Sequence, residues 1–275
     1  MILIAALLLA QDPVLEDALR ARPAGLAVVV GADDPALVLR IAEGGRRIVH
    51  VLEGDEGRRR ALREAAAAGG RAGLVAIEAW DAPVLPHAEH LADLMVVARD
   101  IPEAEILRVL APGGTALVRA DGRWTALRKP RPDGFDDWTH WRHGPDGNMV
   151  SRDREVAAPQ GLRWVAGPAQ DAGGRKWYYD HVLLTANGRN IHVYEEAIVT
   201  RSSWNGVLLW TRPFKAHVFR ETGLPVPADA PPKIKLGTRP SKVRPALAGD
   251  RLFAATEGRL IEIDARTGET TAEFG

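Results

Sequence analysis

Residues 26–35 read LAVVVGADDP, and this stretch decides the class of fold. The apolar, mostly β-branched run at residues 26–30 stands between two glycines and has the length of a buried strand. Asp33 or Asp34 can cap a helix that carries Pro35 in its first turn. The stretch therefore predicts a strand that leads directly into a helix, as in a βαβ unit.

Strand and helix signals continue to alternate as far as residue 128. The sequence predicts further strands at residues 48–52, 74–79, 94–98 and 115–119, and helices at residues 35–42, 56–68 and 102–110. Asp121 and Gly122 form a turn signal that pairs the strand at residues 115–119 with residues 124–128. Because strands separated by helices require right-handed crossovers, we predict a mostly parallel sheet covered on both faces. This is a Rossmann-like α/β domain over residues 12–128.

Two segments of this domain carry a resemblance to a known family. Residues 105–114, EILRVLAPGG, are similar to the RVLxPGG segment of class I methyltransferases that depend on S-adenosylmethionine (SAM). Residues 85–86, LP, followed by residues 92–97, ADLMVV, resemble the LPF…FDLV region of the same family. The resemblance covers residues 24–119 and implies a methyltransferase-like Rossmann domain.

The loop after the first strand departs from that family. In the family a glycine-rich loop lets backbone N–H groups approach the cofactor. Here Gly31 is the one glycine that remains, and Asp33 and Asp34 stand where the methionine end of the cofactor would lie. We therefore expect a retained fold that has lost its cofactor and its catalytic function, with SAM binding as the alternative.

Three acids keep positions that the resemblance gives to cofactor ligands. Glu53 or Asp55, after the second strand, would bind the ribose hydroxyls, and Asp81, after the third strand, would contact adenine. Together with Gly31 these acids form the candidate cofactor-binding set. The alternative is that Glu53 and Asp55 only cap the helix that follows them.

The composition excludes several classes of function. The 275 residues include 36 Lys and Arg against 36 Asp and Glu, so the chain lacks the basic surplus of a nucleic-acid binder. The absence of cysteine removes disulfides, thiolate zinc sites, iron–sulfur clusters and thiol nucleophiles. The sequence contains no serine-hydrolase motif, no phosphate-binding loop and no HExxH metalloprotease motif, so nothing in it indicates hydrolysis.

An apolar run at residues 2–10 opens the sequence and is followed by Gln, Asp and Pro. The run is too short for a stable membrane span, which needs about 20 apolar residues. Its length fits the apolar core of a signal peptide over residues 1–11, although the usual basic start is missing. We expect a periplasmic or otherwise exported protein. A buried first strand or helix of a cytoplasmic protein is the alternative.

Residues 129–160 form a segment rich in Pro, Gly and Asp that contains two tryptophans. Because a disordered linker rarely carries tryptophan, we expect an ordered connector that packs onto a domain surface. Asp137, His140 and His143 lie close together in it and are candidate ligands for a divalent metal. We favour the alternative, in which these side chains only make hydrogen bonds and turn caps and no metal is bound.

From residue 161 onward the helical period disappears. Short strands joined by glycine-containing turns are expected at residues 162–165, 177–185, 191–194, 206–210, 251–256, 259–264 and 269–274. Residues 214–245 interrupt this pattern as a long insertion with several prolines and lysines. The pattern indicates an antiparallel all-β segment over residues 161–275.

Residues 260–269, LIEIDARTGE, resemble the repeat of quinoprotein propellers that use pyrroloquinoline quinone (PQQ), and the upstream sequence WNGVLLW resembles it more loosely. The resemblance implies that Asp264 accepts hydrogen bonds in the turn and that Gly268 takes a positive φ. Trp210 or Phe274 would then pack against a neighbouring blade. The implied fold is the first one to two blades of an incomplete PQQ-type β-propeller, with further blades outside this chain.

The combined pattern resembles exported bacterial PQQ-like propeller repeat proteins with an N-terminal methyltransferase-like domain. We predict an exported binding or scaffold protein that pairs a degenerate, non-catalytic methyltransferase-like domain with a propeller. The alternatives are an active SAM-dependent methyltransferase and a fragment of a PQQ-dependent dehydrogenase. We expect no bound cofactor and no nucleic-acid partner, and the sequence leaves the ligand, a small molecule or a glycan, open.

Overall fold

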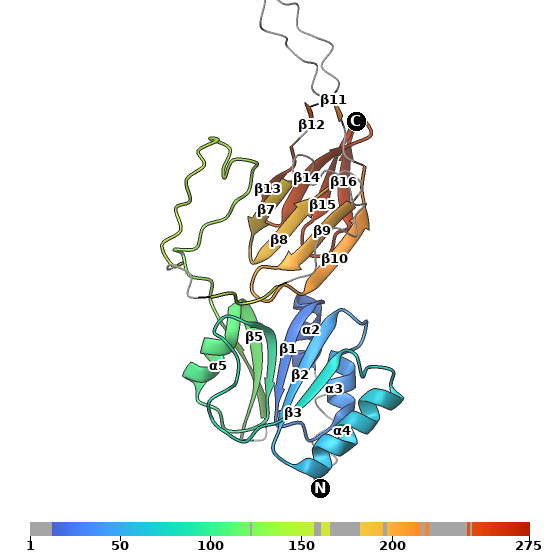
Figure 1. Ribbon diagram of the computed structural model, residues 1–275, viewed down its shortest axis with the longest axis vertical. Coiled ribbons are helices and arrows are strands. Elements are labelled where there is room, and N and C mark those ends of the chain that lie inside the picture. Colours follow the sequence, from blue (N-terminus) through green and yellow to red (C-terminus); the bar gives the residue numbers. More distant parts are fainter. Residues whose placement is uncertain are drawn as a thin grey trace, which may run out of the picture. The chain divides into compact units, whose positions relative to one another are not determined.

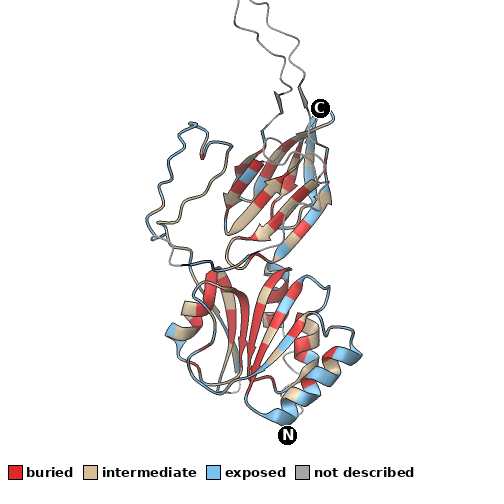
Figure 2. Cartoon of the chain, viewed as in Figure 1, coloured by how far each residue is buried: buried red, intermediate tan, exposed pale blue. Residues whose placement is uncertain are grey.

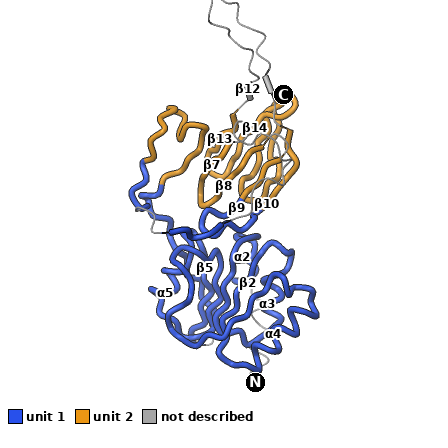
Figure 3. The backbone as a smooth tube through the Cα atoms, in the orientation of Figure 1, with its two compact units in different colours: residues 1–135, 152–167, 201–209 blue, residues 136–151, 168–200, 210–275 orange. Residues whose placement is uncertain are grey.

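The computed structural model describes residues 13–121, 123–156, 161–165, 182–194, 197–215, 218–219, 241–242 and 244–275. The chain divides into two compact units (Figure 3). The first unit comprises residues 1–135, 152–167 and 201–209, and the second comprises residues 136–151, 168–200 and 210–275. The expected signal peptide at residues 1–11 and most of the insertion at residues 214–245 lie outside the described residues.

The first unit is built on a six-stranded sheet of order β3-β2-β1-β4-β5-β6 (Figure 1). Its strands are β1 (Gly25–Val30), β2 (Arg47–Glu53), β3 (Val75–Ala79), β4 (Ala92–Val97), β5 (Leu110–Ala120) and β6 (Arg123–Arg128). The first five strands are parallel, and β6 returns antiparallel to β5 through the predicted hairpin. This order is that of a doubly wound Rossmann-like sheet, so the predicted fold class of this unit is confirmed.

The helices of the sheet begin where the sequence places their caps. Helix α3 (Pro35–Ile41) starts after Asp34, whose carboxylate accepts a hydrogen bond of 2.9 Å from the Ala36 amide. Helices α4 (Glu56–Ala68) and α5 (Glu103–Val109) follow the predicted segments closely. Helix α2 (Pro13–Ala21) was not predicted by the sequence analysis.

Side chains from both faces of the sheet form two separate cores. One face packs against α2, α3 and α4 through residues such as Leu15, Val38 and Leu62. The other face packs against α5 and includes Met95 and Ile106. Strands β1 and β4 are buried on both faces, as Figure 2 shows, because they lie at the centre of the sheet.

The sequence analysis was wrong about residues 110–114, which it placed at the end of the helix at 102–110 and between that helix and the strand at 115–119. Instead β5 begins at Leu110 and contains this Pro-Gly-Gly segment. Gly113 has a φ of +78°, and the β4–β5 register shifts beside it, so the glycines form a bulge within the strand. The Gly113 amide donates a hydrogen bond of 2.8 Å to the Lys129 carbonyl, which closes the bulge against the chain that follows β6.

The second half of the chain forms antiparallel sheets. One four-stranded sheet contains β7 (Val182–Ala186), β8 (Arg189–Val193), β9 (Ala197–Ser202) and β10 (Leu208–Pro213). The other contains β13 (Ala246–Ala248), β14 (Arg251–Thr256), β15 (Arg259–Asp264) and β16 (Thr270–Phe274), and β11 (Val218–Phe219) pairs with β12 (Ser241–Lys242). The predicted all-β region is therefore present, and β9 and β13 are strands that the sequence analysis missed.

The strand predicted at residues 162–165 does not form. These residues have no regular backbone structure, and the side chains of Leu162 and Val165 are 87% and 83% exposed. An apolar pattern forms a strand only where a neighbouring strand and a core receive it, and among the described residues neither covers these two side chains.

In the second unit, a tryptophan of one four-stranded sheet packs on a glycine in a turn of the other. Asp264 accepts a hydrogen bond of 2.8 Å from the Arg266 amide, and Gly268 has a φ of +79°, as predicted. The ring of Trp210, in β10, lies against Gly268 and donates a hydrogen bond of 2.9 Å to the Ala265 carbonyl. Of the two aromatic residues considered, Trp210 packs against a turn of the other sheet, whereas Phe274 is 46% exposed.

The same contact occurs a second time, in the first unit. The Trp164 ring lies against Gly206, which has a φ of +72°, and donates a hydrogen bond of 3.0 Å to the Ser203 carbonyl. Ser203 and Gly206 are three positions apart, as are Ala265 and Gly268. The same packing arrangement, in which a tryptophan ring covers a tight turn, therefore occurs at two places in the sequence.

We predict that Gly268→Ala destabilises the second unit more than Gly258→Ala does. Both glycines have a positive φ, so each substitution should cost about 1–2 kcal/mol of backbone strain. A Cβ at Gly258 meets nothing within 4 Å, whereas at Gly268 it would lie 2.7 Å from the Trp210 ring. Displacing that ring should cost about 1–3 kcal/mol more, measured by chemical denaturation. Equal losses in the two variants would contradict the packing role of Trp210.

Candidate functional site

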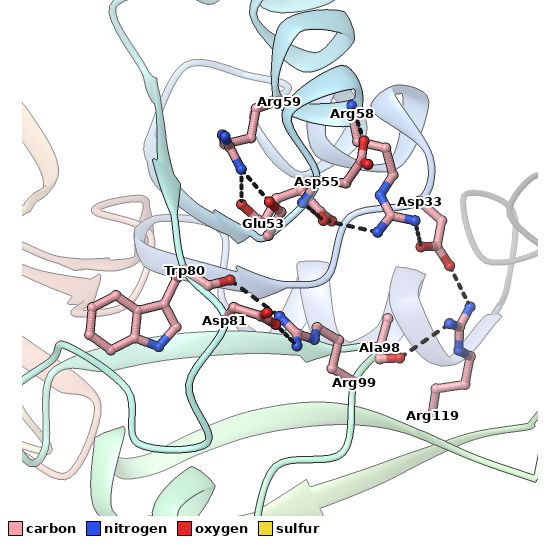
Figure 4. A network of polar contacts seen from close by, with 11 residues as sticks. Asp33, Glu53, Asp55, Arg58, Arg59, Trp80, Asp81, Ala98, Arg99 and Arg119 are labelled. Atoms are coloured by element: carbon pink, nitrogen blue, oxygen red, sulfur yellow. Dashed lines mark hydrogen bonds and ion pairs between the residues drawn. The ribbon is translucent and has the colours of Figure 1, made fainter.

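The carboxyl ends of the parallel strands meet at one edge of the first sheet. In open α/β sheets ligands bind outside this edge, where the strand order reverses, which here lies between β1 and β4. The predicted residues Gly31, Glu53, Asp55 and Asp81 follow or end β1, β2 and β3 and so belong to this edge. The structure therefore brings the candidate set to one place, together with arginines that the sequence analysis did not single out (Figure 4).

Arg99, just after β4, lies across the loop glycine. Gly31 has a φ of +76°, and a Cβ at this position would lie 2.5 Å from Cγ of Arg99. The Arg99 guanidinium forms an ion pair with Asp81 and donates a hydrogen bond of 3.2 Å to the Trp80 carbonyl. The space that a glycine leaves open beside its backbone is therefore filled by an arginine of the same domain.

Two further arginines hold the first acid of the loop. Asp33 lies 3.0 Å from Nη1 of Arg119 and 3.7 Å from Nη1 of Arg58 (Figure 4). Arg119 also donates a hydrogen bond of 3.1 Å to the Ala98 carbonyl at the end of β4. These contacts join the loop after β1 to the ends of β4 and β5 and to the start of α4.

Glu53 is the most deeply buried acid of this edge, with 1% of its surface exposed. Its Oε1 accepts hydrogen bonds from the Asp55 amide at 2.8 Å and from Nη2 of Arg58 at 3.0 Å. Its Oε2 is buried and has no hydrogen-bond partner among the described residues. A buried carboxylate oxygen without a donor is unfavourable, and a hydroxyl group could supply the missing hydrogen bond at this atom. Oδ2 of Asp34, in the loop after β1, is likewise buried without a partner among the described residues.

The other two predicted acids have structural partners. Asp55 is the N-cap of α4, and its Oδ1 accepts a hydrogen bond of 2.7 Å from the Arg58 amide. Asp81 is 78% exposed at its side chain and is paired with Arg99. The capping alternative thus describes what Asp55 does in this structure, while Glu53 accepts a hydrogen bond from the amide of this N-cap residue and leaves Oε2 without a partner.

The structure does not gather the three candidate metal ligands of the connector. Asp137 accepts a hydrogen bond of 3.2 Å from a backbone amide in the β7–β8 turn, and Nδ1 of His140 lies 2.9 Å from the hydroxyl of the preceding threonine. Nε2 of His143 lies 2.7 Å from Oδ2 of Asp136. Within the described ranges, no three His, Asp or Glu side chains are arranged to hold a metal ion.

A chain of three polar side chains on the sheet was missed by the sequence analysis. Nδ1 of His50, in β2, lies 2.9 Å from Nε2 of His87, and Nε2 of His50 lies 3.1 Å from Glu78 in β3. Burial lowers the pKa of His87 to about 4, and the nearby His50 and Arg108 act in the same direction. No sequence pattern could have joined these residues, because they come from two strands and a loop.

We predict that His87 makes the first unit acid-sensitive. The unfolded chain protonates this histidine below about pH 6.5, whereas the folded chain resists protonation until about pH 4. The free energy of unfolding should therefore fall by about 3 kcal/mol as the pH drops through this window, and should be regained above it. His87→Gln should remove that part of the slope in denaturation curves measured at several pH values. An unchanged slope in the variant would contradict the assignment.

Comparisons with known proteins give structural matches only. No family model and no curated protein matches the chain. A putative SAM-dependent methyltransferase from Methanococcus maripaludis matches at 19% identity, over 42% of this chain and 54% of that one, with a TM-score of 0.35. The [4+2]-cyclase SpnF matches at 22% identity, over 44% and 53%, with a TM-score of 0.35. A geranyl diphosphate methyltransferase in complex with SAM matches at 16% identity, over 40% and 47%, with a TM-score of 0.36.

This chain spans about half the length of these solved structures. In the described part of the chain, no helix has both the length and the apolar composition that crossing a bilayer requires.

Proposed function

We propose that the first unit is a binding or scaffold domain that keeps a Rossmann-like fold without using SAM. The observation that carries this proposal is the position of Arg99 across Gly31. A nucleoside cofactor needs the backbone beside such a glycine to be open, because its polar groups bind the N–H groups there. In this chain the cofactor and the arginine side chain would compete for one space, so the residues present do not fit the methionine end of SAM.

Electrostatics supports the same proposal. The methionine end of SAM carries a positively charged sulfonium, and Arg58, Arg99 and Arg119 all reach this edge of the sheet. Each of these arginines is paired with an acid, so cationic side chains of the protein already lie where the sulfonium would have to bind. The Arg99–Asp81 pair is exposed and contributes at most about 1 kcal/mol, so steric occupation of the loop matters more than the pair itself.

An active SAM-dependent methyltransferase is the second candidate, and one observation favours it. Oε2 of Glu53 is buried without a donor, at the position that the family resemblance gives to a ribose ligand. A ribose hydroxyl would supply the missing hydrogen bond. Binding of SAM itself therefore discriminates between the two candidates.

We further propose that the protein is exported and that its second half belongs to a PQQ-like β-propeller. Two four-stranded antiparallel sheets and the repeated tryptophan–glycine contact support the propeller. The apolar run at residues 2–10 supports export. The repeat residues Asp264 and Gly268 serve turn geometry and packing, so the proposal gives this half a binding or scaffold role rather than quinone chemistry.

Isothermal titration with SAM tests the proposed loss of the cofactor. We predict no saturable binding in the micromolar range by the intact chain. Glu53→Gln removes the candidate ribose ligand, and Glu64→Gln, on the exposed side of α4, is the matched control. Micromolar binding that Glu53→Gln abolishes and Glu64→Gln retains would contradict the proposal and establish the methyltransferase alternative.

A further inference from the structure

Lys129 is unusual in the composition of this chain. It is the only lysine among residues 1–175, in a stretch where arginines occur throughout. Arginine stays charged in proteins, whereas a lysine can lose its proton and act as a nucleophile when its charge is destabilised. Lys129 is therefore the one basic side chain of this stretch, apart from the histidines, that can act as a neutral amine.

The backbone of Lys129 is fixed at the end of the first sheet. Its carbonyl accepts a hydrogen bond of 2.8 Å from the Gly113 amide, and its amide donates one of 3.1 Å to the Gly114 carbonyl. These bonds tie the residue to the bulge in β5, so the direction in which its side chain leaves the backbone is set by the fold.

Among the described residues, the hydrogen-bond partners of the Lys129 amine are uncharged. Nζ lies 2.6 Å from the Leu107 carbonyl oxygen and 2.6 Å from Nδ1 of His90. Burial lowers the pKa of Lys129, and Arg108 and Arg163 lower it further, while Glu89 acts in the opposite direction. Lys215 shows the contrast, because its amine lies 2.9 Å from the Glu257 carboxylate, a contact that raises its pKa.

The backbone of His90 has an unusual conformation, and its imidazole lies next to this amine. Its φ is +56°, a left-handed value that is uncommon for a residue with a Cβ, and its amide donates a hydrogen bond of 2.8 Å to the Arg108 carbonyl. Burial lowers the pKa of His90, and Lys129 contributes to this shift. A neutral imidazole with Nδ1 toward the amine can accept its proton.

Three aromatic rings stand together beside this pair. The ring centroids of His90, Phe135 and Trp204 are 6.4 Å, 6.1 Å and 5.4 Å apart in the three pairings. All three residues and Lys129 are partly exposed, and all belong to the first unit (Figure 3). A flat apolar group could therefore reach the amine while it contacts aromatic surface.

We propose that Lys129 is a carbonyl-capture site, which forms an imine with an aldehyde or ketone that carries a flat apolar group. The proposal does not depend on the loss of SAM binding. His90 takes the proton from the Lys129 ammonium, the amine nitrogen attacks the carbonyl carbon, and one proton moves from this nitrogen to the carbonyl oxygen to give a carbinolamine. The proton held by His90 then goes to the hydroxyl oxygen, water leaves, and a protonated imine remains, in which a carbon–nitrogen double bond replaces the carbon–oxygen double bond. No oxidant or reductant takes part in this step.

Reductive trapping with pyridoxal tests the proposal on the intact chain. Pyridoxal is a flat aromatic aldehyde, and cyanoborohydride converts its imine into a stable adduct that peptide mass spectrometry assigns to a lysine. Lys215, which is exposed and paired with a carboxylate, is the internal control. We expect Lys129 to be labelled severalfold faster than Lys215 near neutral pH, because burial lowers the pKa of Lys129 whereas the hydrogen bond to Glu257 raises the pKa of Lys215.

Two variants test whether the labelling of Lys129 reflects the reactivity of its amine or only its exposure to solvent. Lys129→Arg should remove the fast adduct and leave labelling of Lys215 unchanged. His90→Gln should slow labelling at Lys129 and move the midpoint of its rate–pH profile, which a purely structural role of His90 would not do. Equal labelling of the two lysines, or faster labelling of Lys215, would overturn the proposal even if His90→Gln failed to fold. An unchanged rate–pH profile in folded His90→Gln would overturn the role given to His90.

Discussion

The contact between Arg99 and Gly31 is the constraint on which the account of the first unit depends. A glycine with a φ of +76° is retained at the end of β1, but the space beside it is filled by the aliphatic part of Arg99. The guanidinium then reaches the end of β3 through Asp81. The geometry that exposes backbone amides to a nucleotide in other Rossmann-like domains serves here to pack one strand end against the next.

Another arginine of the first unit also links the ends of different elements. Arg47 is 7% exposed and donates hydrogen bonds to the carbonyls of Leu19, Arg22 and Ile41, which ties α2 and α3 to the start of β2. Its planar fork can serve several carbonyls at once while keeping its charge. The arginines of the carboxyl edge follow the same rule with carboxylates as partners. Lys129 departs from this use, because its amine contacts a carbonyl oxygen and an imidazole nitrogen in place of a carboxylate.

The local elements and the class of the first sheet could be predicted from the sequence, whereas the contacts between side chains of distant elements could not. The helix at residues 56–68 and the strands at residues 251–256 and 259–264 have the predicted bounds, because propensity and turn residues specify them locally. The Pro-Gly-Gly segment was misassigned because its bulge depends on pairing with β4. The acids of the site were found from their positions after strands. Their arginine partners were not, because each comes from a different element.

A crystal structure of the protein soaked in millimolar SAM tests the central claim most directly. The account predicts that Arg99 stays against Gly31 and that no nucleoside density appears at the carboxyl edge of the sheet. SAM bound at this edge, with the Arg99 side chain displaced from the loop and a ribose hydroxyl hydrogen-bonded to Oε2 of Glu53, would contradict the account.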